Sequence, residues 1–192
     1  MSTSLHNKTT PFTYEDGLQT DRLITRFLTP EDIPAWAAFF KDKEALEFLS
    51  TFGFNSDIDM SKFWIEKQLL RYKENRFGLQ ALIHKETNEF IGQCGLVSQQ
   101  VGGVAEMEIG YHIIKKYWGQ GYASEAAKCF MNYAFTNNLA PSLISIIDIN
   151  NIKSQRVADK NKLTRERQTT WAHHNVYIYR ITKEKWQNSQ QE

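Results

Sequence analysis

In residues 118–124 the chain reads WGQGYAS, between a predicted strand at residues 105–114 and a predicted helix at residues 123–135. The first turn of a helix leaves backbone N–H groups without acceptors, and the helix dipole places partial positive charge there. Gly119 and Gly121 lack a Cβ atom, so the backbone can approach a phosphate closely and adopt unusual torsion angles. This stretch therefore predicts an anion-binding site.

Three other interpretations of this loop have to be weighed. A Walker loop requires Gly-Lys-Ser/Thr, which the chain lacks. A dinucleotide-binding fingerprint begins at the end of its strand and usually opens its domain, whereas residues 115–118 separate strand from glycine here and the loop lies past the middle of the chain. A tight connection without any ligand is the third interpretation, and the loop taken alone leaves it open.

The spacing of apolar residues predicts a mixed α/β domain with a largely antiparallel sheet, not a doubly wound nucleotide fold. Residues 29–32, TPED, have the capping residue, the proline and the acids of a helix start, and residues 143–149 form a nearly continuous β-branched run, as in a strand buried on both faces. We expect strands at residues 20–27, 77–84, 89–97, 105–114, 143–149 and 171–182, and helices at residues 29–40, 59–74, 123–135 and after residue 151.

The composition is that of an ordinary globular chain, because 41% of the 192 residues are hydrophobic and 23% are charged. We expect a single domain at residues 18–186, with a flexible N-terminal lead-in at residues 1–17 and a tail at residues 187–192. The formal net charge of +1 gives no support to a nucleic-acid partner, which needs a strong basic excess.

Several features indicate a cytoplasmic protein without a membrane partner. No apolar run approaches the ~20 residues that span a bilayer, and residues 1–11 lack the apolar stretch of a signal peptide. The two cysteines, Cys94 and Cys129, have no histidine companion at metal-ligand spacing, so we expect them to be reduced and buried. The cysteine spacing therefore predicts no metal site.

Four motifs, in the expected order, resemble the GNAT superfamily of acetyltransferases, and within it the RimJ/RimL-type branch of ribosomal-protein N-acetyltransferases. WGQGYA at residues 118–123 resembles the GNAT pyrophosphate loop, Gln/Arg-x-x-Gly-x-Gly/Ala, with the Trp in first position that is common in this branch. The other motifs are LQTDRL at residues 18–23, EIGY at residues 108–111 and NIKSQRVA at residues 151–158, and the likeness ends in residues 176–186.

The resemblance implies the GNAT acyl-CoA N-acyltransferase fold, an α/β (mixed α+β) architecture. In that fold a central, mostly antiparallel twisted sheet of about seven strands is splayed between the fourth and fifth strands and is flanked by about four helices. It also implies acetyl-CoA as acetyl donor, with its pantetheine arm in the splay. The positions that then contact the coenzyme are Ile109, Tyr111, Ile113, Trp118, Gly119, Gln120, Gly121, Tyr122, Ala123, Ser124, Asn151 and Ser154.

The implied reaction is attack of an amine on a thioester, which needs a neutral amine, a stabilised oxyanion and a proton for the leaving thiolate. Backbone N–H groups of residues 109–111 are the best oxyanion candidates. Glu106, Glu108 and His112 share one face of their strand by its two-residue period. Among them we favour Glu108 as the general base, directly or through water. A solvated or ion-paired carboxylate is the equally weighted alternative.

Two departures from the family pattern bear on the general acid and on the acceptor side. The tyrosine that many GNAT enzymes use as the acid corresponds to Ala158 here, so Ser154, one turn after Asn151, is the remaining candidate near the sulfur. Asn151 and Ser154 both have an alternative role in satisfying the start of a helix. Residues 160–163 read KNKL, where relatives usually have Lys-x-Gly-Phe.

Thiol and imidazole chemistry is not favoured elsewhere in the chain. Cys94 in a strand and Cys129 in a helix lack an obvious base partner, which argues against a covalent acetyl-cysteine route. Adjacent histidines in a strand point to opposite faces, so we expect that His173 and His174 do not chelate one metal together.

We therefore expect an acetyl-CoA-dependent N-acetyltransferase that acts directly on a primary amine, with a protein N-terminal α-amine favoured. Lysine side chains, polyamines and aminoglycosides stay open as acceptors, and the chain is expected to be a monomer or a homodimer. A non-catalytic acyl-CoA-binding or regulatory module on the same fold is the main alternative, motivated by Ala158 and residues 160–163. A structural domain without a coenzyme site is the third.

Overall fold

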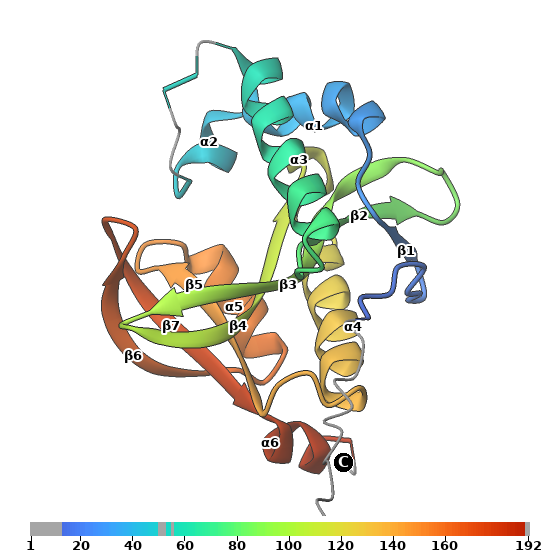
Figure 1. Ribbon diagram of the computed structural model, residues 1–192. Coiled ribbons are helices and arrows are strands. Elements are labelled where there is room, and N and C mark those ends of the chain that lie inside the picture. Colours follow the sequence, from blue (N-terminus) through green and yellow to red (C-terminus); the bar gives the residue numbers. More distant parts are fainter. Residues whose placement is uncertain (1–12, 50–52, 55, 191–192) are drawn as a thin grey trace, which may run out of the picture.

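The computed structural model describes residues 13–49, 53–54 and 56–190, and this part of the chain forms one seven-stranded sheet flanked by helices (Figure 1). The strands are β1 (Leu23–Arg26), β2 (Leu79–His84), β3 (Phe90–Val101), β4 (Val104–Ile113), β5 (Ser142–Asp148), β6 (Thr164–Trp171) and β7 (His174–Thr182). The helices are η1 (Pro30–Asp32), α1 (Ile33–Phe40), α2 (Lys43–Leu46), α3 (Asp57–Lys73), η2 (Lys115–Tyr117), α4 (Tyr122–Thr136), α5 (Ile152–Lys160) and α6 (Lys183–Asn188). The expected mixed α/β architecture is confirmed.

The sheet has the order β1-β2-β3-β4-β5-β7-β6, and every neighbouring pair is antiparallel except β4 and β5. A parallel pair needs a crossover connection, which α4 supplies between these two strands. β3 and β4 pair at ten positions, whereas β4 and β5 pair only where Glu108 lies opposite Ile144. The expected splay between the fourth and fifth strands is thus confirmed.

Helices cover both faces of the sheet. On one face α4 packs on β3 and β4 around the fully buried Phe130. On the other face α1 and α3 pack around Trp36, whose ring stacks on that of Phe39 with 4.4 Å between centroids. Neighbouring residues of β2 divide between these clusters, Leu82 in the first and Ile83 in the second, because side chains alternate along a strand.

The C-terminal strands correct the prediction from sequence. The pattern places the last strands within residues 171–182, but β6 already begins at Thr164. Its residues, TRERQTTW, are mostly polar on both faces of an edge strand, so they lack the apolar alternation that reveals a strand. His173 lies in the β6–β7 turn with a φ of 69°, so placing it within a strand was wrong. The short helices α2 and α6 were also missed, since they are too brief to show periodicity.

The N-terminal segment contributes to the core. Tyr14, which lies in the expected lead-in, is buried in the α4 cluster, and its hydroxyl donates to the Gly78 carbonyl at 2.7 Å. Residues 1–12 of the lead-in and residues 191–192 of the expected tail lie outside the described residues. Among the helices that the structure describes, none has both the length and the apolar character needed to cross a membrane.

His112 on β4 is enclosed by aromatic rings of the α1–α3 layer. Its ring centroid lies 5.0 Å from that of Trp64 and 5.9 Å from that of Phe39, both in edge-on geometries. Burial lowers the pKa of His112 from 6.5 to about 4, because the protonated ring would lose its hydration. His112 is therefore neutral at pH 7, and it joins β4 to the helices while part of its side chain lines the cavity described below.

Acid is expected to weaken the fold through His112. The unfolded chain takes up a proton at the ordinary pKa of 6.5, whereas the folded chain resists it down to about 4, so the free energy of unfolding falls as the pH drops through this window. We expect a loss of roughly 1–2 kcal/mol between about pH 7 and pH 5, measured by urea unfolding with circular dichroism, and a clearly smaller loss in His112→Gln. Equal losses in the two proteins would contradict this role.

Candidate functional site

Beyond Glu108, β4 presents an edge to which β5 does not pair. The Ser145 hydroxyl reaches across the opening and donates to the Ile109 carbonyl at 3.1 Å. Because backbone groups alternate along a strand, the N–H and C=O of Tyr111 face the same way as the Ile109 carbonyl. The strand edge at residues 109–113 is therefore directed into the opening.

Trp118 fixes the glycine-containing loop against the end of β4. Its indole N–H donates to the Ile113 carbonyl at 2.6 Å, and Lys153 Nζ lies 4.5 Å from the centroid of its ring. The side chain packs, partly buried, against the α4 cluster. The Trp in the first loop position thus acts through packing and through one hydrogen bond to the strand edge.

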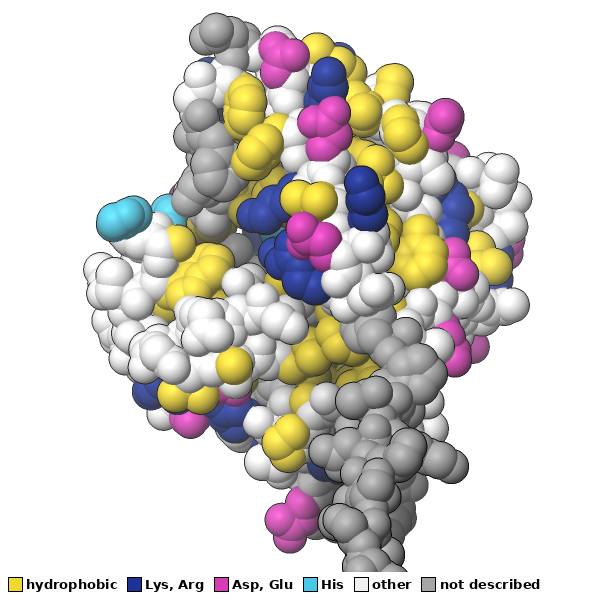
Figure 2. All heavy atoms as spheres, viewed as in Figure 1, with side chains coloured by type: hydrophobic (Ala, Val, Ile, Leu, Met, Phe, Trp, Pro, Cys, Tyr) yellow, Lys and Arg dark blue, Asp and Glu magenta, His cyan; other side chains and the backbone are white. Residues whose placement is uncertain are grey.

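A cavity of about 410 Å³ opens where β4 and β5 separate. Its walls come from α3, the middle of β4, β5, the start of α5 and the β6–β7 turn. Figure 2 shows a hollow beside α3, with Lys and Arg side chains gathered at its margin. Glu108, Tyr111, Asn151 and Ser154, all selected from the sequence, line this cavity. The structure thus brings the candidates from strand and helix to one place.

The N-terminus of α4 is left open by its loop. Gly119 and Gly121 have φ angles of +76° and +86°, which glycine adopts without the steric cost of a side chain. No side chain caps the helix, and the first hydrogen bond inside it runs from the Glu125 N–H to the Gly121 carbonyl at 3.0 Å. The amides of residues 122–124 therefore have no acceptor within the helix.

Two cations converge beside Gly121 from distant parts of the chain. A Cβ atom on Gly121 would lie 3.6 Å from Arg22 Nη2 and 3.9 Å from Lys160 Nζ. Arg22 is held in place by Glu125, which it contacts at 2.6 Å, and Lys160 ends α5. Sequence reasoning missed both cations, although Arg22 lies in the LQTDRL motif. Open amides, a helix dipole and two cations make this loop suited to a diphosphate.

Glu106 and Glu108 lie in different surroundings, which separates their roles. Glu106 makes a two-pronged ion pair with Arg180, with N–O distances of 2.6 and 3.0 Å, and these bonds lower the pKa of Glu106. Glu108 lines the cavity and accepts from Gln99 Nε2 at 2.7 Å. Burial raises the pKa of Glu108, which makes its carboxylate a stronger base than an exposed one.

The start of α5 contributes Asn151 and Ser154. The Asn151 side chain accepts from the Ser154 N–H at 3.0 Å and so caps the helix. The Tyr111 hydroxyl donates to the Ser154 carbonyl at 3.1 Å, and burial raises the pKa of Tyr111, so this hydroxyl stays protonated. Ala158, at the position of the usual tyrosine, is buried and offers no polar group. Tyr111 thus brings a hydroxyl to the cavity region. Sequence reasoning selected it only as a coenzyme contact on the strand edge.

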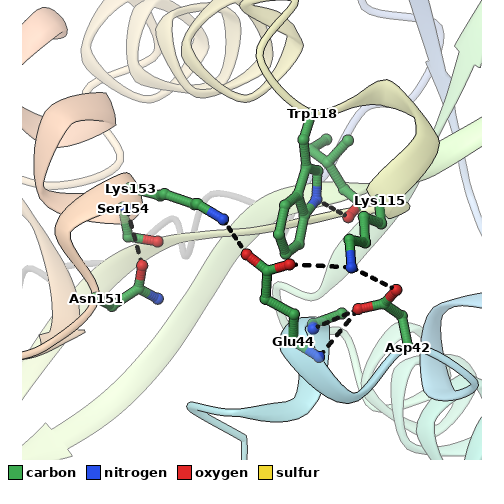
Figure 3. A network of polar contacts seen from close by, with 9 residues as sticks. Asp42, Glu44, Lys115, Trp118, Asn151, Lys153 and Ser154 are labelled. Carbon is green, nitrogen blue, oxygen red and sulfur yellow. Dashed lines mark hydrogen bonds and ion pairs between the residues drawn. The ribbon is translucent and has the colours of Figure 1, made fainter.

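A cluster of charges joins α2 to both sides of the opening (Figure 3). Glu44 binds Lys115 at 2.9 Å and also contacts Lys153 on α5, while Asp42 binds Lys115 at 3.0 Å. Lys115 follows β4, so the Glu44 carboxylate bridges the β4 side and the α5 side. Exposed ion pairs are individually weak, so this cluster shows that α2 lies beside the opening but adds little to stability.

The cysteines and paired histidines stand apart from this chemistry. Burial raises the pKa of the Cys94 thiol and of the Cys129 thiol, and neither side chain lines the cavity. His174 Nδ1 lies 3.6 Å from an Asp148 oxygen at the cavity wall. In the part of the chain that the structure describes, no three His, Cys, Asp or Glu side chains are grouped to hold a metal.

Comparison with known proteins gives one family. Residues 22–164, more than half of the chain, match the family described as acetyltransferase (GNAT) domain. YkkB of Bacillus subtilis (strain 168) is 33% identical over 144 residues, which make up 74% of this chain and 82% of YkkB.

Solved structures give the same result. An acetyltransferase from Agrobacterium tumefaciens str. C58 aligns with a TM-score of 0.71 and 26% identity, over 88% of this chain and 95% of that chain. RimL, the ribosomal L7/L12 alpha-N-protein acetyltransferase in complex with coenzyme A, aligns with a TM-score of 0.72 over 89% of this chain and 99% of that chain, and its 17% identity shows a shared fold. The chain therefore belongs to the GNAT family and is an acetyl-CoA-dependent acetyltransferase.

Proposed function

We propose that this enzyme transfers the acetyl group of acetyl-CoA directly to a primary amine, with an α-amine as the favoured acceptor. The observation that carries the coenzyme assignment is the convergence on Gly121, where open helix amides meet Arg22 and Lys160 at a position without a Cβ atom. This cradle fits a diphosphate both in charge and in space. The coenzyme A bound to RimL, a protein of the same fold, supports the assignment.

The remaining coenzyme contacts follow the opening between the strands. The amides of residues 119–124 hold the diphosphate, and the β4 edge at residues 109–113 pairs with the amides of the pantetheine arm, as in strand addition. The start of α5 closes the other side. The side-chain oxygen of Asn151 accepts from the helix start, so the side-chain NH₂ group of Asn151 is the part that can donate to the pantetheine arm.

Acetyl-CoA supplies a thioester carbonyl that an amine attacks. Within residues 109–111, the backbone N–H groups of Ile109 and Tyr111 face the opening, and they stabilise the oxyanion. Glu108 accepts the proton of the amine, directly or through water, and its raised pKa favours this transfer. On the α5 side, the hydroxyls of Tyr111 and Ser154 are the groups that can give a proton to the leaving thiolate.

The nature of the base favours an α-amine over a lysine side chain. The α-amine at a peptide N-terminus titrates near ~8 and a lysine near ~10.4, so about a tenth of the former but less than about 0.1% of the latter is neutral at pH 7. A carboxylate such as Glu108 is a weak base, which suits the amine that needs less help. RimL, which shares the fold, is described as an alpha-N-protein acetyltransferase.

Gly121→Ala is expected to weaken coenzyme binding at least about tenfold, because its methyl group would occupy the space between Arg22 and Lys160. Gly103→Ala is the matched control, since Gly103 also has a positive φ, +80°, but lies in the β3–β4 turn with nothing near its Cβ position. Titration calorimetry with CoA measures both affinities. An unchanged affinity in Gly121→Ala, or an equal loss in both variants, would remove the diphosphate from this loop.

Glu108→Gln is expected to lower kcat about 100-fold or more, because the amide cannot accept the proton. The wild-type rate should fall as the pH drops through the raised pKa of Glu108, and the variant should lack this acidic limb. Thiol release from acetyl-CoA, followed across pH with an α-amine acceptor, measures both.

Glu106→Gln separates catalysis from folding in the same strand. It breaks the pair with Arg180, so the urea midpoint should fall while kcat stays within a few-fold of the wild type. A Glu108→Gln enzyme that keeps the wild-type kcat would exclude Glu108 as the base.

A further inference from the structure

Two cations line the α3 wall of the cavity. Lys67 and Arg71 are four residues apart on α3, so they lie on one face of this helix. They are the only Lys or Arg side chains in the lining that the structure describes. Figure 2 shows Lys and Arg side chains beside the hollow next to α3. This wall is therefore positively charged.

The acids of the cavity are already bonded within the chain. Glu108 accepts from Gln99 at 2.7 Å. Asp148 accepts from the Asn150 N–H at 2.9 Å and lies 3.6 Å from a nitrogen of His174. Both negative side chains of the cavity thus have hydrogen-bond partners outside α3, while Glu108 also interacts electrostatically with Arg71.

The cations on α3 make no direct ion pair with an acid among the described residues, although Arg71 interacts electrostatically with Glu108. Lys67 makes no hydrogen bond or ion pair there, and Arg71 makes one long bond, from Nη1 to the Phe77 carbonyl at 3.4 Å. Burial lowers the pKa of both side chains, that of Lys67 further because Arg71 lies nearby. Lys67 is exposed and Arg71 is partly buried, and neither is hydrogen-bonded to a carboxylate in the part of the chain that the structure describes, so both are free to bind an arriving anion.

We propose that Lys67 and Arg71 bind a carboxylate that the acceptor carries close to its amine. The inference rests on the proposed function, because the amine has to reach Glu108 across the same cavity. A guanidinium binds a carboxylate through two parallel hydrogen bonds, and an ammonium adds a point charge beside it. The acceptor class is then an α-amine with a nearby acid, either a free amino acid or a peptide whose first residue is acidic.

This assignment separates acceptors that the sequence leaves open. The cavity, at about 410 Å³, has room for the thioester end of the coenzyme and for an acceptor of amino-acid or dipeptide size. Polyamines and aminoglycosides carry several positive charges, which the α3 wall repels. The carboxylate-bearing amine is attracted by the same wall.

Matched acceptor pairs test the proposal. Alanine and phenylalanine are compared with their amides, and Asp-Ala amide with Asn-Ala amide, by thiol release from acetyl-CoA. We expect kcat/KM to be at least about tenfold higher for the acid in one of these two comparisons. A preference for the free amino acid over its amide identifies the α-carboxylate as the group bound, and a preference for Asp-Ala amide over Asn-Ala amide identifies an acidic first residue.

Variants of α3 link this preference to the two side chains. Lys67→Gln and Arg71→Gln should each lower kcat/KM for the acid about tenfold and leave that for the matching amide nearly unchanged. Lys73→Gln is the control, because Lys73, like Lys67, is an exposed lysine of α3 but lies outside the cavity lining. It removes the same charge and should preserve the preference. Urea unfolding confirms that each variant is folded.

A binding arm keeps this test independent of turnover. The N-acetylated acid and the N-acetylated amide are titrated into the CoA-bound protein, and tighter binding of the acid that Arg71→Gln abolishes supports the proposal. If no amine is acetylated, the proposed function fails, while this arm still decides on the carboxylate. The carboxylate proposal alone is overturned if acid and amide have equal kcat/KM in both acceptor comparisons and equal affinity in the binding comparison. It is also overturned if the preference for the acid survives in both Lys67→Gln and Arg71→Gln.

Discussion

The separation of β4 from β5 after one paired position is the constraint on which the site depends. Had the two strands paired along their length, the β4 edge at residues 109–113 would be bonded to protein, and the cavity between them would be closed. The single pair at Glu108 and Ile144 instead leaves peptide groups directed into an opening. It also places Glu108 at the point where the opening begins, between the strand edge and the α3 wall.

The second requirement is a helix start that is held open. Arg22 and Thr20 both bind Glu125 in the first turn of α4, so the N-terminal strand region fixes this helix relative to the sheet. Lys160 approaches from the far end of α5. The loop at residues 119–121 therefore ends where three distant segments meet, and the φ of +86° at Gly121 favours glycine at that point.

Much of the fold and part of the site could be predicted from the sequence. Local signals, such as the glycines at the start of α4 and the apolar run of β5, predicted the loop and most elements. The resemblance to GNAT acetyltransferases led to Glu108 and Ser154, which line the cavity. What failed depended on tertiary contacts. Lys67 and Arg71 look like the solvated face of a helix, β6 has no alternation, and the partnership of Glu106 with Arg180 joins residues far apart in the chain.

The central claim is that the open amides at the start of α4 hold the diphosphate of the coenzyme. It is tested most directly by ¹⁵N amide chemical shifts during titration with CoA and, separately, with pantetheine, which lacks the diphosphate. We expect CoA to shift the amides of residues 119–124 and those of the β4 edge at residues 109–113, and pantetheine to shift the β4 edge alone. Shifts that leave residues 119–124 unchanged with CoA and gather on another surface would contradict the account.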